Sequence, residues 1–210
     1  MLALNEPALA AGIRHGMRRG EAEAICPNVV TIVSDPGIEA VRFEPVALAV
    51  EELIPTIELA MPGLVFSPVA GAVKYYGGEV ALVDRIAKEL EAVTGPGYKI
   101  GIAAGPFAAQ RAAELADPVN VVGDDAAFLA SLDIAALGSE ELAATFRWLG
   151  ITTLGALAEL PRDAVTTRFG PLGARAHRLA LGLDRATESR QIPPDLDVEE
   201  RFSPPLDNLE

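Results

Sequence analysis

Three arginines in the C-terminal half of the sequence could contact a phosphate. Arg168, Arg175 and Arg178 flank two glycines, Gly170 and Gly173, in the stretch RFGPLGARAHR. Glycines permit close approach of a backbone to an anion, and guanidinium groups supply positive charge. The pattern predicts either a phosphate contact or a packed helical turn, and the sequence leaves both open.

Carboxylates are missing from the most apolar strand end. The chain has 30 acidic residues, yet LVFSPVAGAV, residues 64–73, holds none. A hard cation such as Mg²⁺ needs oxygen ligands, which this strand end does not supply. Glu58 and Asp84 are the carboxylates that a residual enzyme could use instead. Glu58 alternates with apolar residues, which predicts a side chain that faces solvent or is paired.

Composition excludes several other kinds of chemistry. The single cysteine, Cys26, rules out an internal disulfide, and with only His15 and His177 beside it we expect no zinc cluster and a packed thiol. No apolar run approaches the roughly 20 residues that cross a bilayer. We therefore expect a cytoplasmic protein with no membrane partner. The net charge of −13 disfavours long-range attraction to nucleic acid.

Strand and helix patterns alternate up to about residue 123, which predicts an α/β domain. The expected elements are two short helices within 4–24, a strand over 29–33, a helix over 41–54, two strands around the Pro62-Gly63 turn, an amphipathic helix over 78–95, a strand within 98–104, a helix over 106–116 and a strand over 119–122. From residue 124 onward the pattern is helical. Residues 187–210 are proline-rich and acidic, as in a linker.

Four stretches, in this order, resemble the Y-family DNA polymerases: AAGIRHGMRRGEAEAICPNVV, GLVFSPVAGAV, IGIAAGPFAAQRAAELADP and LGITTLGALAELPRDAVTTRFGPLGARAHRLALGLD. The resemblance implies an α/β, polymerase-like palm with partial fingers, followed by an all-α thumb of the helix-hairpin-helix type. The implied boundaries are 1–35 for the fingers, 36–122 for the palm, 123–185 for the thumb, and 186–210 for a linker and the start of a little finger. Family members begin with one more palm strand, which carries an acidic metal ligand, so we expect a chain truncated at both ends. An unrelated α/β protein is the alternative.

The resemblance also implies that the catalytic site is degenerate. Active members carry Ser-Ile-Asp-Glu-Ala where this chain has Ser67 to Gly71, so the metal-binding Asp and Glu fall on Val69 and Ala70. Two-metal nucleotidyl transfer requires such carboxylates. Family residues that touch the incoming triphosphate are also replaced; the matching positions are Glu6, Leu9 and Gln110. We therefore expect no Mg²⁺ binding, no cofactor and no polymerase activity.

One stretch, KYYGGEVALVDRIAKEL, resembles a polymerase-like subgroup, the ImuB proteins of actinobacterial mutasomes. Tyr75, Tyr76, Gly77 and Gly78 carry this signal and are expected to serve core and turn roles. The subgroup is catalytically inactive, and the resemblance implies an adaptor in DNA-damage-induced, error-prone translesion synthesis. The implied partners are the sliding clamp, a C-family error-prone polymerase and a RecA-like accessory protein, bound mostly through regions after the thumb, with nucleoid association on DNA damage.

Two other functions compete with the adaptor. One is a DNA-binding module that makes weak contact through the thumb arginines, and the other is a residual nucleotidyl transferase that uses Glu58 or Asp84. In the first helix-hairpin-helix motif of the thumb, Glu140 and Glu141 would repel a phosphate. The second such motif, RFGPLGARAHRL, is therefore the better candidate for DNA contact. Trp148 and Phe169 are expected in the core rather than as base-stacking platforms.

Overall fold

The computed structural model describes residues 4–14 and 16–184. His15 and the predicted linker over 186–210 lie outside the described residues. No helix in the described ranges combines the length and the hydropathy that a membrane span requires.

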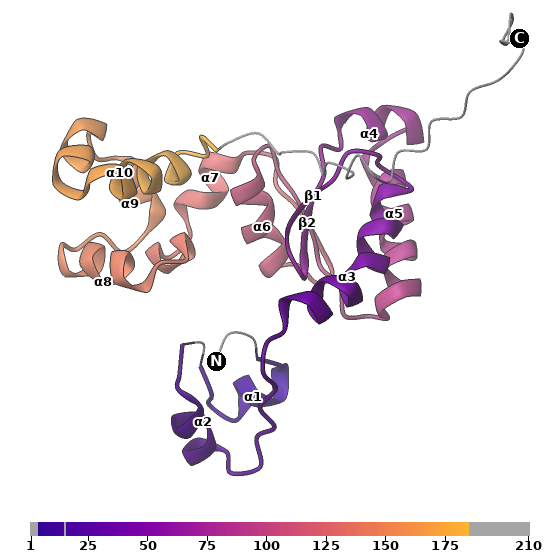
Figure 1. Cartoon of the computed structure of the whole chain (residues 1–210). Helices are drawn as coiled ribbons and strands as arrows, with labels where there is room; N and C mark the ends of the chain where they lie inside the picture. The colour runs from indigo at the N-terminus through magenta and orange to yellow at the C-terminus, as the bar shows by residue number, and fades with distance from the viewer. Residues whose placement is uncertain (1–3, 15, 185–210) are drawn as a thin grey trace, which may run out of the picture. The chain divides into compact units, whose positions relative to one another are not determined.

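The chain forms two compact units, residues 1–41 and residues 42–210 (Figure 1). The first unit holds two short helices, α1 (Glu6–Ala10) and α2 (Arg19–Ile25), as the sequence predicted. Ile13, in the connection between them, is fully buried. This side chain is the largest apolar group that the first unit encloses.

The strand predicted over residues 29–33 does not form. This run has no regular backbone structure, and Val30, Ile32 and Val33 are between 83% and 89% exposed. β-branched residues favour strands, but a strand also needs a partner edge, and no described strand pairs with this run. The prediction was wrong because it rested on local propensity alone.

The second unit contains the predicted hairpin. β1 (Glu58–Met61) and β2 (Leu64–Phe66) are antiparallel and join through Pro62 and Gly63. Gly63 has a φ of +93°, a left-handed conformation that glycine adopts without steric penalty. The Pro-Gly pair therefore fixes where the chain reverses.

A separate pair of strands follows later in the chain. β3 (Ile100–Ile102) and β4 (Val119–Val121) are parallel and are connected by α6 (Pro106–Glu114). Parallel strands need such a crossover, because the chain must return to the end where it started. The described residues thus form two two-stranded sheets rather than one sheet.

Two long helices supply most of the core beside these strands. α3 (Pro36–Glu51) and α5 (Glu79–Thr94) lie on one side of the strands, and α6 lies on the other (Figure 1). The predicted amphipathic helix is confirmed in α5. Its buried face and the residues that pack with it are Val50, Ile57, Leu82, Ile86, Leu90 and Ile100.

A helix that the sequence analysis missed follows β2. The sequence analysis treats residues 64–73 as a strand and its end, with core and turn roles for Tyr75 to Gly78, but Ala70–Tyr76 form the helix α4. Alanine and lysine favour helix, and Gly77 ends it in a left-handed conformation. The apolar run therefore changes from strand to helix immediately after Pro68.

The rest of the described chain is helical, as predicted. Its elements are α7 (Asp125–Ala130), the 3-10 turn η1 (Ile134–Leu137), α8 (Glu140–Trp148), α9 (Leu154–Ala158) and α10 (Arg162–Ala180). Phe146, Leu154 and Leu157 are fully buried in a core that also includes Ala108 of α6. The helical region, residues 125–184, is thus packed onto α6.

Trp148 does not belong to this core. Its side chain is 82% exposed, so the prediction of a core tryptophan was wrong. Phe146 occupies the inner face of α8, and a residue two positions further on lies about 200° around the helix, toward solvent. Phe169 does pack on the core, with its ring centroid 4.9 Å from that of Phe146.

Two carboxylates hold the loop between β3 and α6. Asp125 accepts hydrogen bonds from the backbone N–H groups of Ala104 (3.0 Å) and Gly105 (2.7 Å). Asp184 accepts one from the N–H of Phe107 (2.7 Å). Charged acceptors make strong hydrogen bonds, so this loop is tied to both ends of the helical region.

We predict that Asp125→Ala lowers the free energy of unfolding by about 2 kcal/mol, because two amides lose a charged acceptor. Urea unfolding monitored by circular dichroism measures the change, and hydrogen exchange at Ala104 and Gly105 should accelerate. Asp84→Ala, which alters an exposed aspartate on α5, is the matched control and should stay within about 0.5 kcal/mol of the parent. Equal unfolding midpoints for the two variants would contradict the prediction.

Candidate functional site at the end of β2

The end of β2 has one polar side chain. The Ser67 hydroxyl donates a hydrogen bond to the backbone oxygen of Thr56 (2.7 Å). Val69 is half-buried against the α/β core and precedes α4, while Ala70 is exposed. Mg²⁺ binds through several oxygen ligands, carboxylates above all. The side chains at this strand end do not fit that cation.

The two alternative carboxylates do not share a site. Glu58 stands opposite Phe66 in the hairpin and is 9% exposed, so of the two alternatives that the sequence left open it does not face solvent. It has an interaction partner within the chain, which agrees with a paired carboxylate. Asp84 is exposed on α5, midway between Leu82 and Ile86, which face the core. Asp84 therefore points away from the strands.

Val69, Ala70 and Gln110 are brought to neighbouring hollows. A cleft of about 620 Å³ has both Val69 and Gln110 in its lining. A second hollow, of about 470 Å³, is lined by Val69, Ala70 and the β3–α6 loop, including Ala104 and Gly105. Val69 thus lines both hollows, whereas Gln110 lines only the larger one and Ala70 only the smaller one.

Several polar groups around these hollows are bonded within the chain. The Gln110 amide nitrogen lies 3.5 Å from the Glu114 carboxylate. The start of a helix is a common anion site because its first N–H groups are free. At the start of α6, however, the N–H of Phe107 donates a hydrogen bond to Asp184. The N–H groups of Ala104 and Gly105 donate to Asp125.

The sequence analysis missed the two aspartates that accept hydrogen bonds from these backbone amides. Asp184 is 77 residues from Phe107 along the chain, and Asp125 is 20 residues from Gly105. The only local signal is the pair Asp124 and Asp125 at a helix start, which is typical of a cap. Asp124 does cap α7, whereas Asp125 reaches back to the loop.

Glu6 and Leu9, the other two predicted triphosphate positions, lie on α1 in the first unit. Leu9 is 40% exposed. An apolar side chain there offers no hydrogen-bond donor to a phosphate. Gln110, in contrast, belongs to the second unit.

The three predicted DNA-contacting arginines are exposed on α10. Gly170, with φ of +62° and ψ of −152°, divides this helix into two segments. The Arg168 guanidinium lies 5.8 Å from the centre of the Phe169 ring. Arg175 and Arg178 follow in the second segment. Their contact with phosphate stays a prediction.

The two glycines of this region have different roles. Nothing lies within 4 Å of a Cβ built on Gly170, so its backbone is accessible. Gly173 is buried, and a Cβ there would overlap the Cβ of Phe169 and stand 3.2 Å from the Val165 carbonyl oxygen. Gly173 therefore allows close packing within α10, which is the packed helical turn that the sequence left open.

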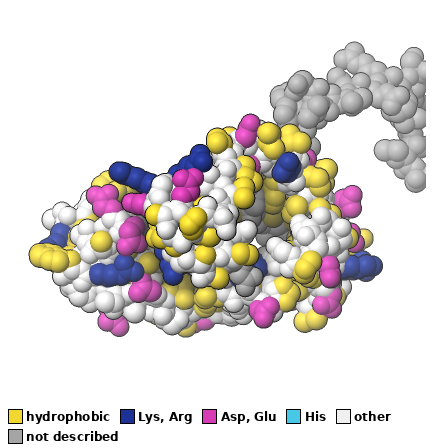
Figure 2. Space-filling model, turned by 90° about the horizontal axis from the view of Figure 1, so that it is seen from below, with side chains coloured by type: hydrophobic (Ala, Val, Ile, Leu, Met, Phe, Trp, Pro, Cys, Tyr) yellow, Lys and Arg dark blue, Asp and Glu magenta, His cyan; other side chains and the backbone are white. Residues whose placement is uncertain are grey.

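An exposed ion pair orders the surface next to α8. The Arg147 guanidinium contacts Asp133 (2.8 Å) and Glu140 (3.3 Å). A hydrogen bond from the backbone N–H of Ala135, together with that guanidinium, lowers the pKa of Asp133 below its usual value. The hydrogen bond to Asp133, together with the negative charges of Asp133 and Glu140, raises the pKa of Arg147. Basic side chains on the face shown in Figure 2 are interspersed with acidic ones rather than gathered in a patch.

The chain resembles catalogued polymerases over most of its length. It is 29% identical over 179 residues to DNA polymerase IV of Dehalococcoides mccartyi strain CBDB1, which covers 82% of this chain and 46% of the relative. DNA polymerase IV of Methanoculleus marisnigri is 30% identical over 180 residues, covering 82% and 49%. The chain therefore spans about half the length of the curated relatives it matches.

Solved structures share the fold. DinB from Sulfolobus solfataricus superposes with a TM-score of 0.75 at 20% identity, covering 88% of this chain and 57% of that one. A ternary complex of Dbh gives 0.71 at 20% identity, covering 88% and 58%. The model of the impB/mucB/samB family matches residues 1–114, which is more than half of the chain. The chain belongs to this family and is a Y-family DNA polymerase-like protein.

Proposed function

We propose that this chain is a non-catalytic, polymerase-like adaptor of the ImuB type, acting in DNA-damage-induced, error-prone translesion synthesis. The proposal rests on the uncharged end of β2, where by the resemblance Val69 and Ala70 match the positions of the metal-binding Asp and Glu of active members. An uncharged strand end does not hold the Mg²⁺ ions that nucleotidyl transfer uses. Mg²⁺ is therefore not expected to bind there.

The residues around the end of β2 support the same proposal, because they are poorly suited to bind a nucleoside triphosphate. Backbone amides that could meet a triphosphate are bonded to Asp125 and Asp184. Two carboxylates so close would also repel phosphate oxygens. Gln110 supplies no positive charge, and the chain as a whole carries −13. Binding of a nucleoside triphosphate would need attractive groups that these residues do not provide.

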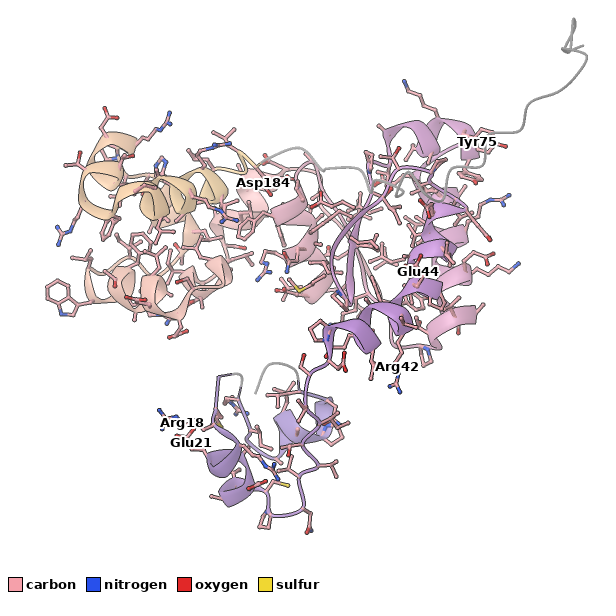
Figure 3. All side chains as sticks on the ribbon, in the orientation of Figure 1. Arg18, Glu21, Arg42, Glu44, Tyr75 and Asp184 are labelled. Atoms are coloured by element: carbon pink, nitrogen blue, oxygen red, sulfur yellow. The ribbon has the colours of Figure 1, made fainter. Side chains whose placement is uncertain are left out.

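The stretch that resembles ImuB forms the α4–α5 corner. Gly77 and Gly78 have positive φ, as a turn role requires. Tyr76 packs on the core, with the Arg85 guanidinium 5.0 Å from its ring centre. Tyr75 is 82% exposed, so a core role does not suit it (Figure 3). An exposed tyrosine at this corner suits contact with another protein.

By the same resemblance, the partners are the sliding clamp, a C-family error-prone polymerase and a RecA-like accessory protein, and the site of action is the nucleoid after DNA damage. Affinity capture from DNA-damaged cells, read by mass spectrometry, tests this with the 210-residue chain beside the longest natural form of the protein. Recovery of the clamp and the C-family polymerase supports the adaptor. Recovery of neither by either form rejects it.

We predict no templated primer extension by this chain with Mg²⁺ or Mn²⁺, and none after Val69→Asp with Ala70→Glu. The reason is that the triphosphate-binding groups are missing as well as the metal ligands. DNA polymerase IV of Dehalococcoides mccartyi, assayed alongside, is the positive control. Synthesis that Glu58→Gln abolishes would instead establish the residual nucleotidyl transferase.

The single substitutions Val69→Asp and Ala70→Glu should change the free energy of unfolding by different amounts. Val69→Asp should lower the free energy of unfolding by about 1–3 kcal/mol, because it desolvates a carboxylate against the core. Ala70→Glu, on an exposed position, should change it by less than about 0.5 kcal/mol. Urea unfolding of both single variants measures the difference, and equal midpoints would show that Val69 is as accessible to water as Ala70.

A DNA-binding module is the second candidate, favoured by the exposed Arg168, Arg175 and Arg178. We predict a Kd for duplex DNA of about 10 μM or weaker at physiological salt, as for non-specific binding. Replacing all three arginines by alanine should weaken binding and flatten its salt dependence. Fluorescence anisotropy across a salt series measures both effects.

The control for this experiment is Lys74→Ala with Lys88→Ala, on exposed positions of α4 and α5. If DNA contacts α10, the control keeps the affinity of the parent chain. An equal loss per removed charge in the two variants would show that attraction is spread over the surface. Nanomolar affinity at physiological salt would favour the DNA-binding module over the adaptor.

A further inference from the structure

β4 is the outermost strand of its sheet in the described part of the chain. It pairs with β3 along one edge, and no described strand pairs with its other edge. On one face of β4, the Asn120 side chain donates a hydrogen bond to the Ala112 carbonyl oxygen of α6 (3.2 Å). Val119 and Val121 lie on the opposite face, because successive side chains of a strand alternate. We call the unpaired side of β4 its outer edge.

Hydrogen bonds to β3 identify the backbone groups that the outer edge presents. The carbonyl oxygen of Pro118 and the N–H of Val122 both bond to backbone groups of β3, each at 2.8 Å. Backbone groups of successive residues point to opposite edges of a strand. Val119 and Val121 therefore direct their N–H and C=O groups outward. Within the described residues, these outward groups have no hydrogen-bond partner.

Two features of β4 are ones that often protect a sheet edge from a second strand, namely its short length and its proline. The position of Pro118 nevertheless leaves the outer edge intact, because the N–H that proline lacks would point toward β3. Val121 is 52% exposed, so its side chain is available to a strand laid along this edge. The outer edge therefore offers both backbone groups and apolar surface.

The charges around the outer edge determine which kind of strand fits it. Residues 114–125 contain four carboxylates and no basic side chain. Of these, Asp117 and Asp124 are exposed and flank β4 at its two ends. A segment that carries lysine or arginine on both sides of its apolar residues would complement these charges, whereas nucleic acid would be repelled.

A second copy of this chain is a poor occupant of the outer edge. Antiparallel pairing of two β4 strands would bring Asp117 of one copy close to Asp124 of the other, and like charges opposite each other destabilise a strand pair. The net charge of −13 adds long-range repulsion between copies. Residues 187–210 are acidic as well, so their charge does not complement the edge either.

We propose that the outer edge of β4 binds an extended, basic segment of another protein, which adds a strand to the β3–β4 sheet. The bound segment hydrogen-bonds to the backbone of Val119 and Val121 and covers the Val121 side chain. Its basic residues lie beside Asp117 and Asp124. The proposal rests on the backbone and the charge of this edge, and it holds whether or not the chain is an adaptor.

Three synthetic peptides test the proposal on the 210-residue chain. The probe is Lys-Lys-Val-Thr-Val-Thr-Val-Lys-Lys. One control has glutamate in place of every lysine, and the other has proline in place of the central valine, which keeps the charge but removes a strand N–H. We expect the probe to slow hydrogen exchange of the Val119 and Val121 amides roughly tenfold, with no change in α8. Neither control peptide should do so.

Variants of the chain locate the binding site. Val121→Pro removes an outward N–H at a position where an edge strand accommodates proline, and it should abolish binding of a fluorescent probe measured by anisotropy. Asp117→Asn with Asp124→Asn should weaken binding about threefold at low salt, and asparagine retains the cap on α7. The matched control, Asp84→Asn with Glu91→Gln, removes two exposed charges from α5 and should leave the Kd unchanged.

Three results would overturn the proposal. One is exchange of the Val119 and Val121 amides that is as slow without peptide as that of Val122, which would show that the edge is already covered. Another is equal binding of the probe and either control peptide, because the effect would then need no strand pairing or no basic charge. The third is the lack of any response up to about 1 mM probe, a concentration at which even weak association registers.

Discussion

The second unit depends on two carboxylates that hold one loop. Two N–H groups of the β3–α6 loop, those of Ala104 and Gly105, donate to Asp125, and the N–H of Phe107 in the first turn of α6 donates to Asp184. Asp125 and Asp184 are the first and last residues of the described helical region. Both ends of this region therefore contact the same loop and the helix start that follows it. With the loop held, α6 presents Ala108 to the core of the helical region, and its backbone from Ala109 to Ala113 lies against Gly101 of β3. One polar junction thus sets the position of both apolar cores.

The same junction shapes the candidate site. Its amides stand beside the end of β2, where a polymerase would place its metal ions and triphosphate. In this chain the amides serve the fold, and Val69 packs on the core instead of presenting an oxygen. In the adaptor that we propose, groups that could bind a substrate would serve the fold instead, and the polymerase-like scaffold would persist without the chemistry. The exposed corner at Tyr75 and the exposed helix α8 are surfaces that such a scaffold can offer to other proteins.

The sequence predicted those elements whose signal is local. The hairpin follows from Pro62-Gly63 between two apolar runs, and α5 follows from its amphipathic spacing. Elements that depend on distant partners were missed. Residues 29–33 have strand propensity without a partner edge, and Trp148 lies on the outer face of a short helix whose core register Phe146 determines. No local sequence pattern indicates that Asp184 accepts a hydrogen bond from the N–H of Phe107, which lies 77 residues away along the chain.

Trp148 is the single tryptophan of the chain, and its exposure has a spectroscopic consequence. An indole that is hydrated in the native protein emits much as it does in the unfolded chain. Its fluorescence will therefore report little about denaturation. A protein that covers the end of α8 would transfer the ring to an apolar environment and shift its emission to shorter wavelengths. The residue that contributes least to the core is thus a built-in optical reporter of association at this helix.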